Sequence, residues 1–228
     1  ALSALLTLLA LAAFHYARVP TMAPGDAGPL LGLTDVRRLF ADRRFTFLML
    51  GGAVPAKIAL AGFLFYLTPL ALHQLAYSPA AIGRAVMLYF VLVAAVNPLA
   101  SWLADHFGWR LALTVGGGLL IGIGGLAGVA GWLPAEAAVW TGIAALGIGT
   151  GLAAAPMQAL ASEIGARAGA TSVAVVLRTV ERLGSVIGPV WAGAWLVSGD
   201  WRGAMAAIGV AVLAGTLLCL GVREEGAR

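Results

Sequence analysis

The sequence predicts an all-α protein of the polytopic membrane class, a bundle of six complete transmembrane helices plus one partial helix. Residues of the hydrophobic types make up 61% of the chain, charged residues make up only 11%, and the mean hydropathy is +0.95. Soluble domains carry about 25% charged residues. The apolar residues also gather into runs of about 20, the length that an α-helix needs to cross a hydrocarbon core about 30 Å thick.

The predicted spans cover residues 45–72, 81–103, 111–132, 137–162, 172–197 and 204–222. The apolar run over residues 1–17 begins without Met and without the basic residues of a signal peptide, so we interpret it as the end of a truncated transmembrane helix. Residues 45–222 are then a six-helix half-bundle, and residues 223–228 form a cytoplasmic tail.

Residues 18–44 separate the partial helix from the six spans, and their Pro and Gly content predicts a linker. The last part of this linker places Val36, Leu39 and Phe40 at helical spacing among several arginines. An apolar face surrounded by basic residues is typical of an amphipathic helix at a membrane surface. We therefore expect this segment to lie along the membrane.

The basic residues are distributed unevenly between the two sides of the predicted bundle. When the connections are assigned alternately, one side has Arg202, with Arg84 close to its edge. The other side collects Arg18, Arg37, Arg38, Arg43, Arg44, Arg110, Arg167, Arg223 and Arg228. The positive-inside rule makes this second side cytoplasmic, together with the linker and the C-terminus. The expected location is a bacterial inner (plasma) membrane.

The stretch SWLADHFGWR, residues 101–110, is predicted to be a tight cytoplasmic turn between two spans. Gly108 permits a close reversal of two helices, and Asp105 can accept hydrogen bonds from the N-terminal amides of a neighbouring helix. Arg110 can bridge to an acidic group across the inner mouth. The alternative is that Asp105 and Arg110 are ordinary solvated loop charges.

This turn resembles the loop signature G-x-x-x-D-R-x-G-R-R of the major facilitator superfamily. Asp105, Gly108 and Arg110 match the signature, whereas Ser101 replaces the first Gly, and His106 and Trp109 replace the first and second basic residues. The resemblance implies the C-terminal half of such a transporter, with the end of helix six, the central linker and helices seven to twelve. It also implies a cytoplasmic gating role for the turn.

A second stretch, GSVIGPVWAG over residues 184–193, resembles the Gly-Pro pattern of helices at the interface between the two halves of that family. Gly184, Gly188, Pro189 and Gly193 carry this resemblance. It implies that they pack between the halves.

Lys57 lies within a long uncharged run, where a charge costs at least about 2.5 kcal/mol on insertion scales. Such a residue is expected to face a cavity or a charged partner, and Pro55 is expected to loosen the helix beside it. The alternative is that the span begins near Ile58 and that Lys57 reaches the cytoplasmic headgroups.

Arg178, Glu181, Arg182 and Ser185 follow one another at helical spacing and form a polar stripe in a later span. Glu181 can pair with Arg178 one turn away, or with Lys57 if the two spans are neighbours. The alternative places the whole stripe at the inner membrane interface. Lys57, Arg178, Glu181 and Arg182 are the candidates for substrate binding or ion coupling.

Several other classes are excluded by composition and spacing. The basic residues lie between apolar runs, so nucleic acid is not an expected partner. Cys219 is the single cysteine, and His15, His73 and His106 lie far apart, so no metal site or Ser/His pair is predicted. The segment GIGGLA matches a dinucleotide fingerprint, but it lies inside a span and indicates helix packing. We expect no enzyme and no cofactor.

Two functions remain. The first is secondary active transport of a small molecule by alternating access, with a missing N-terminal six-helix half, membrane lipid and protons as coupling ion among the partners. The second is a membrane-embedded sensory or scaffolding module that retains the transporter fold without transport. The intramembrane charges favour the first function, because burying a charge in a membrane costs free energy and a scaffold does not require such charges.

Overall fold

The computed structural model describes residues 32–131 and 133–222. The chain divides into two units, Ala1–Gly32 and Leu33–Arg228, and the described helices belong to the second unit. Within the described residues the structure is helical throughout, without a strand, which confirms the all-α fold class. The partial helix predicted over residues 1–17 and the tail over residues 223–228 lie outside the described residues.

The first long helix runs without interruption over Arg43–Gln74, but its winding changes along its length. Its segments are α3 (Arg43–Leu48), η1 (Met49–Ala53), α4 (Val54–Ile58), η2 (Ala59–Leu67) and α5 (Thr68–Gln74). The η1 and η2 segments are π-helical. Pro55 lacks the N–H that would bond to the preceding turn, and the π-helical η1 lies in that turn, whereas η2 begins after Lys57.

Five further long helices follow in the described part of the chain. They are α6 (Pro79–Phe107), α7 (Arg110–Leu126), α8 (Ala135–Ile164), α9 (Ala170–Ser198) and α10 (Trp201–Cys219). Short 3₁₀ turns follow α7 and α8, namely η3 (Ala127–Val129) and η4 (Ala166–Ala168). Each of the six predicted spans is therefore a helix, with ends within a few residues of the predicted ones.

Within the described residues, five helices are long and apolar enough to cross a membrane: Arg43–Gln74, α6, Arg110–Val129, α8 and α10. The helix α9 has 29 residues, which is sufficient length, but Arg178, Glu181 and Arg182 lower the hydropathy of its first half. The span predicted over residues 172–197 is thus confirmed as a helix, and its passage across the membrane stays a prediction.

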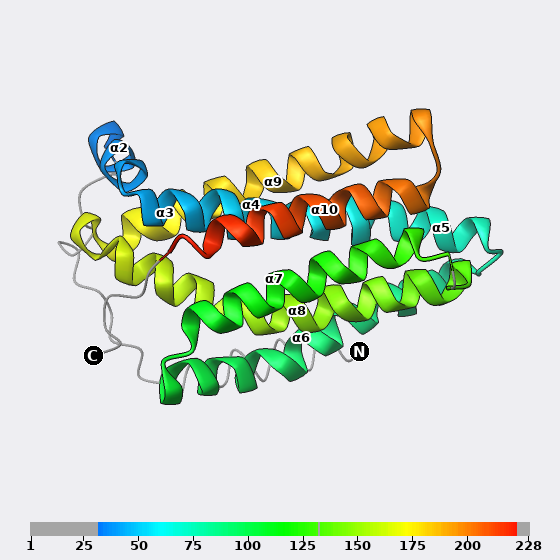
Figure 1. Ribbon diagram of the computed structural model, residues 1–228, viewed down its shortest axis with the longest axis horizontal. Helices are drawn as coiled ribbons and strands as arrows, with labels where there is room; N and C mark the ends of the chain where they lie inside the picture. The colour runs from blue at the N-terminus through cyan, green and yellow to red at the C-terminus, as the bar shows by residue number, and fades with distance from the viewer. Residues whose placement is uncertain (1–31, 132, 223–228) are drawn as a thin grey trace, which may run out of the picture. The chain divides into compact units, whose positions relative to one another are not determined.

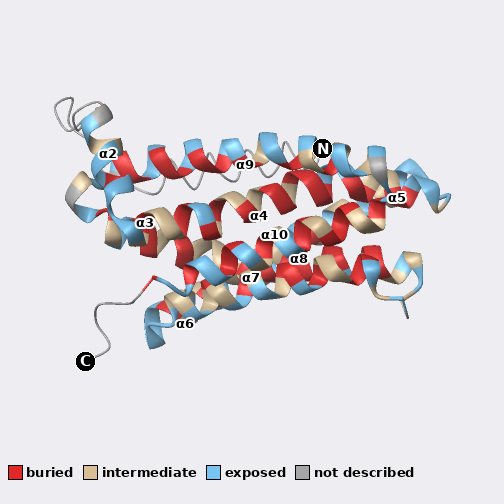
Figure 2. Cartoon of the chain, turned by 45° about the horizontal axis from the view of Figure 1, so that its top comes forward, coloured by how far each residue is buried: buried red, intermediate tan, exposed pale blue. Residues whose placement is uncertain are grey.

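The helices lie side by side in one elongated bundle (Figure 1). The helix α8 packs against α6 and α7, α7 also packs against α10, and the first helix packs against α9 and α10. Buried side chains gather where these helices face one another (Figure 2), and Leu64, Ile143 and Met205 are among the fully buried ones. The helix α6 differs, because only 11% of its most apolar stretch is buried, against 56% in the first helix and in α8.

The connections alternate between the two ends of the bundle. The helix α2 (Leu33–Ala41), the turn at residues 108–109 and the connection at residues 165–169 lie at one end (Figure 1). The connections after α5, α7 and α9 lie at the other end. The grouping of basic segments at one end agrees with the predicted sidedness, and the assignment of that end to the cytoplasm stays a prediction.

The amphipathic segment of the predicted linker is helical, as expected, and forms α2 and the start of α3. Leu39 is buried beside Gly165 at the connection between α8 and α9. The Asp42 carboxylate caps α3 by accepting a hydrogen bond from the backbone N–H of Arg44 at 2.8 Å. These contacts join α2 to the bundle, whereas its position on the membrane surface stays a prediction.

Two glycines of α9 bring this helix into close contact with the first helix. A Cβ atom added to Gly188 would lie 2.7 Å from the carbonyl oxygen of Ile58 and 2.8 Å from the backbone nitrogen of Gly62. A Cβ atom added to Gly184 would lie 2.7 Å from the carbonyl oxygen of Val54. The two backbones therefore approach so closely that no side chain fits between them.

This contact corrects one expectation drawn from the family resemblance. Gly184 and Gly188 were expected to pack between two halves of a transporter, but their close contacts join α9 to the first helix of the same bundle. The physical reason is that a small-residue pair permits a close approach of two helices whether they belong to the same half or to different halves, so the sequence pattern does not identify the partner helix. Packing between halves stays a prediction for Pro189 and Gly193.

We predict that Gly188→Val lowers the thermal stability of the protein. The branched side chain would overlap the backbone of the first helix, and overpacking of this kind costs about 1–3 kcal/mol. Gly116→Val is the matched control, because a Cβ atom at Gly116 of α7 meets nothing within 4 Å. The measurement is the melting temperature in detergent, and equal values for the two variants would contradict the close approach.

Candidate functional site

The candidate site lies where α4 and α9 touch. Gly184 removes the side chain that would separate them, and its added Cβ would lie 2.9 Å from the Cβ of Lys57. Glu181 precedes Gly184 by one turn of α9, so its carboxylate comes to the level of Lys57 on the facing helix. Both residues lie far from the ends of their helices.

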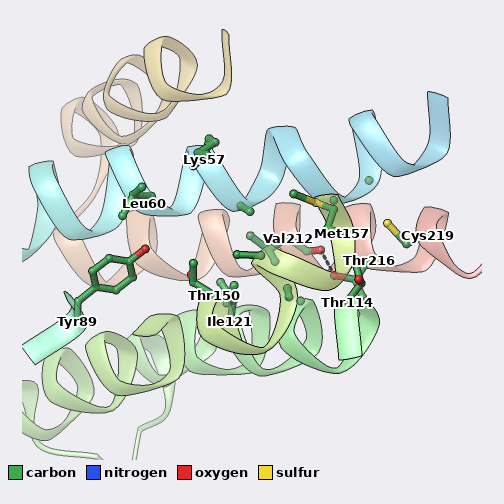
Figure 3. A pocket seen from close by; sticks show the side chains of 16 residues that line it. Lys57, Leu60, Tyr89, Thr114, Ile121, Thr150, Met157, Val212, Thr216 and Cys219 are labelled. Carbon is green, nitrogen blue, oxygen red and sulfur yellow. Dashed lines mark hydrogen bonds between the residues drawn. The ribbon is translucent and has the colours of Figure 1, made fainter. Parts of the chain in front are cut away.

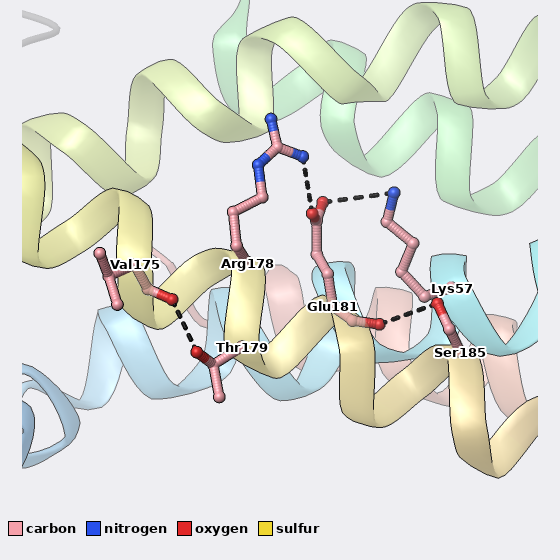
Figure 4. A network of polar contacts seen from close by, with 6 residues as sticks. All are labelled: Lys57, Val175, Arg178, Thr179, Glu181 and Ser185. Atoms are coloured by element: carbon pink, nitrogen blue, oxygen red, sulfur yellow. Dashed lines mark hydrogen bonds and ion pairs between the residues drawn. The ribbon is translucent and has the colours of Figure 1, made fainter.

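The Glu181 carboxylate is shared by two cationic side chains. Its Oε1 lies 3.5 Å from Nζ of Lys57, and its Oε2 accepts a hydrogen bond of 2.8 Å from Nη1 of Arg178. The two cations approach the carboxylate from different directions, Arg178 along the same helix and Lys57 from the facing helix (Figure 4). The exposed fraction of the side chain is 8% for Glu181, 28% for Lys57 and 61% for Arg178. We call these three residues the charge cluster.

The charge cluster satisfies the electrostatic requirement of a buried carboxylate. An ionised carboxylate removed from water is costly unless it is both hydrogen-bonded and paired with opposite charge. Both oxygens of Glu181 have a cationic neighbour, and one of these neighbours also donates a hydrogen bond. The same argument applies to Lys57, whose charge would otherwise be unpaired inside a membrane span.

The sequence analysis predicted part of this arrangement. Lys57 has a charged partner, as expected, and Glu181 contacts both of the partners that were considered as alternatives. Ser185 continues the predicted stripe, since its hydroxyl donates to the backbone carbonyl of Glu181 at 3.1 Å. Arg182 is exposed on α9 and does not enter the charge cluster. The roles of these residues in binding or coupling stay predictions.

A cavity of about 60 Å³ lies next to the charge cluster, inside the bundle. Lys57 and Leu60 of the first helix, Tyr89 of α6 and Met157 of α8 are among the side chains around it (Figure 3). The remaining lining residues come from the first helix, α7, α8 and α10. Lys57 therefore belongs to the charge cluster and is also one of the residues that line the cavity.

The cavity wall carries hydroxyl groups that the sequence analysis did not single out. Thr114, Thr150 and Thr216 line the cavity from α7, α8 and α10. Two of these hydroxyls donate to the backbone one turn earlier, each at 2.8 Å: Thr114 to the carbonyl of Arg110, and Thr216 to the carbonyl of Val212 (Figure 3). Thr114 and Thr216 are each the single Thr of an apolar run, which is a signal that could have found them, whereas the run that contains Thr150 also contains Thr141.

The predicted cytoplasmic turn has the geometry that its sequence indicates. Gly108 ends α6 in the left-handed region, with φ of 70°, a conformation that glycine adopts without strain. Nη1 of Arg110 lies 2.9 Å from Oε2 of Glu163, at the end of α8, and Nη2 lies 3.8 Å from Oδ1 of Asp105. Arg110 thus bridges to an acidic group, as expected, although Glu163 itself was not identified from the sequence.

This finding favours a structural contact over ordinary solvated charges for Arg110, because its ion pair links the start of α7 to the end of α8. The side chain of Asp105 is 75% exposed and its distance to Arg110 is longer. A pair of this exposure contributes about 0–1 kcal/mol. The expected hydrogen bonds from helix amides to Asp105, and the gating role of the turn, stay predictions.

A second polar contact lies at the opposite end of the bundle. The hydroxyl of Tyr77, in the connection between α5 and α6, donates a hydrogen bond to the carboxylate of Glu136 in the first turn of α8. This hydrogen bond raises the pKa of Tyr77 above its usual value. The ring of Tyr77 also packs 6.4 Å from that of Trp140. Both ends of α8 are therefore joined to a neighbouring part of the bundle.

Metal binding has no support in the described part of the chain, where no group of three His, Cys, Asp or Glu side chains could hold a metal ion. Cys219 is buried in α10. The expectation of no cofactor stays a prediction.

Membrane-length helices packed around a buried, paired charge define a polytopic integral membrane protein with a polar site inside its helices. The chain belongs to the Major Facilitator Superfamily, whose family model matches residues 1–189 and 58–228. This match confirms the resemblance that was drawn from the turn at residues 101–110. The comparisons with curated proteins and with solved structures find no match. Family membership assigns the protein to membrane transport, and members of this family are in general not enzymes.

We predict that Glu181→Gln destabilises the protein more than Lys57→Gln does. Loss of the Glu181 charge leaves Lys57 and Arg178 without a counter-charge, and the cost is below the value of about 3–5 kcal/mol for a fully buried pair because the Arg178 side chain is 61% exposed. Loss of Lys57 leaves Glu181 paired with Arg178, so the cost there is about 1 kcal/mol or less. The measurement is the melting temperature of the full-length protein in detergent.

The double variant provides the control for that prediction. Lys57→Gln combined with Glu181→Gln should recover part of the loss caused by Glu181→Gln, because only Arg178 then lacks a partner. Equal losses for the two single variants, or strict additivity in the double variant, would contradict a shared carboxylate.

Proposed function

We propose that this chain is the C-terminal half of a secondary active transporter that moves a small molecule across the membrane by alternating access. The observation that carries the proposal is the charge cluster, which lies inside the long helices of a Major Facilitator Superfamily member. Ionisable groups at such positions are costly and are characteristic of substrate and ion pathways. Lys57, Arg178, Glu181 and Arg182 are the proposed residues for substrate binding or coupling.

The exposed surface of the bundle supports an N-terminal half as partner. The helix α6 is the least buried of the membrane-length helices that the structure describes, and α9 exposes Val186, Val190 and Val197. An apolar surface on two helices is the kind of surface that another helical bundle or lipid covers. We assign the faces of the first helix, α6, α8 and α9 to contact with the missing half.

The contacts at both ends of α8 support movement of the bundle as one body. Arg110 pairs with Glu163 at one end, and Tyr77 bonds to Glu136 at the other. Alternating access in this class of fold proceeds by rocking of one bundle against another around a fixed central site. Asp105, Gly108 and Arg110 are proposed to form the part of the cytoplasmic surface that engages and releases the other half.

The proposed orientation places α2 and the 108–109 turn in the cytoplasm, because arginines gather at that end. The proposed location is the inner (plasma) membrane of a bacterium. Protons are the proposed coupling ion, since Glu181 is the acidic side chain of the charge cluster.

We predict that the full-length protein, reconstituted into liposomes, shows counterflow of at least one solute from a panel of labelled organic acids, amino acids, sugars and nucleosides. Counterflow means that unlabelled solute inside the liposome accelerates uptake of labelled solute, which only a carrier with alternating access produces. An imposed proton gradient should increase accumulation. The measurement is radiolabel uptake, with and without preloading and with and without the gradient.

Two variants make this test specific. Lys57→Gln should abolish most of the counterflow, whereas Arg84→Gln, which removes an exposed charge on α6, should leave it intact. A correctly inserted protein without counterflow of any solute would contradict transport, and it would favour a sensory or scaffolding module with the transporter fold.

A further inference from the structure

We infer that the transported substrate is an organic anion, a carboxylate or phosphate ester, that competes with Glu181 for the ammonium group of Lys57. The inference rests on the proposed transport function and specifies its substrate class. The evidence is that Lys57 and Arg178 lie at different distances from Glu181, and that the three side chains of the charge cluster carry two positive charges and one negative charge.

The cluster has one positive charge in excess. Two cationic side chains share a single carboxylate, and within the described residues no second acidic side chain lies within 4 Å of Lys57 or Arg178. Arg182, one residue after Glu181, adds another positive charge to the exposed side of α9. An excess charge inside a membrane protein is costly, and an arriving anion removes that cost, whereas a cation increases it.

The two cations are held with different strength. Arg178 belongs to the same helix as Glu181, three residues earlier, and donates a hydrogen bond of 2.8 Å. Lys57 belongs to another helix, and its Nζ lies 3.5 Å from the nearer oxygen, beyond the usual range of a hydrogen bond between an ammonium and a carboxylate. Arg178 is thus the permanent partner of Glu181, and Lys57 is the exchangeable one.

Because of this difference, Lys57 can move away from Glu181 while the buried carboxylate remains paired with Arg178. When Lys57 turns to another anion, Glu181 keeps the hydrogen bond from Arg178, and Lys57 acquires a new counter-charge. Lys57 has the freedom to do so, because 28% of its side chain is exposed. Glu181 therefore acts as an internal anion that holds Lys57 when the substrate is absent.

The alternative is that a carboxylate of the proposed N-terminal half neutralises the excess positive charge. The charge cluster would then be neutral at all times and would have no free cation for a substrate. The two cases differ in one measurable respect. If a substrate anion competes with Glu181, removal of the Glu181 charge raises the affinity of the protein for anions. If a second carboxylate neutralises the charge cluster, small anions cause no thermal stabilisation that depends on Lys57.

The test uses the purified full-length protein and ligand-induced thermal stabilisation. The probes are acetate, succinate, benzoate and glycerol phosphate as sodium salts, compared with acetamide, succinamide, benzamide and glycerol at ionic strength matched with sodium chloride. We expect at least one anion to raise the melting temperature above that of its neutral counterpart. Lys57→Gln should abolish this difference, whereas Arg84→Gln should retain it.

The Glu181→Gln variant distinguishes competition with the substrate from a purely structural role of Glu181, because only competition predicts tighter anion binding in the variant. With the internal competitor removed, the apparent Kd for the stabilising anion should fall about tenfold, a change that corresponds to about 1.4 kcal/mol. If Glu181→Gln does not fold, Arg178→Gln replaces it and should raise the Kd, because Glu181 then depends on Lys57 alone.

The inference is overturned if no anion exceeds its neutral counterpart, or if the difference persists in Lys57→Gln. It is also overturned if the counterflow experiment identifies a neutral or cationic solute as the substrate. In that last case the proposed transport function stands and only the substrate class is wrong, so the two failures can be told apart.

Discussion

The arrangement of this protein depends on one carboxylate that serves two cations inside a bundle of apolar helices. Glu181 lies on α9, one of its partners is on the same helix, and the other is on the first helix. Because the Glu181 carboxylate is buried and would be costly without a counter-charge, the contact between α9 and the first helix is stabilised by electrostatics as well as by packing.

Close backbone packing makes the electrostatic contact possible. Gly184 and Gly188 allow α9 to approach α4 and η2 without intervening side chains, and the π-helical winding around Pro55 changes the direction of residues on both sides of Lys57. A regular α-helix would present its residues at a different angle there. Local backbone geometry and small residues therefore determine which face of the first helix carries the charge toward Glu181.

The sequence predicted the helices and part of the site, for physical reasons that particular residues make clear. Apolar runs of about 20 residues predict spans because the bilayer thickness demands them, and a lone Lys57 in such a run predicts a partner because its charge must be compensated. The sequence did not reveal that Glu181 contacts both cations, that Glu163 receives Arg110, or that Gly184 packs within the bundle. Those contacts depend on how helices distant in sequence are placed, which hydropathy and periodicity along one chain do not encode.

An experimental structure of the full-length protein in lipid nanodiscs, determined by cryo-electron microscopy, tests the central claim most directly. The measured quantities are the distances from the Glu181 carboxylate to Nζ of Lys57 and to the guanidinium of Arg178. The account predicts both distances within about 4 Å in the substrate-free protein, with the carboxylate between the two cations. A Lys57 side chain directed to lipid or to the headgroups, more than about 10 Å from Glu181, would contradict it.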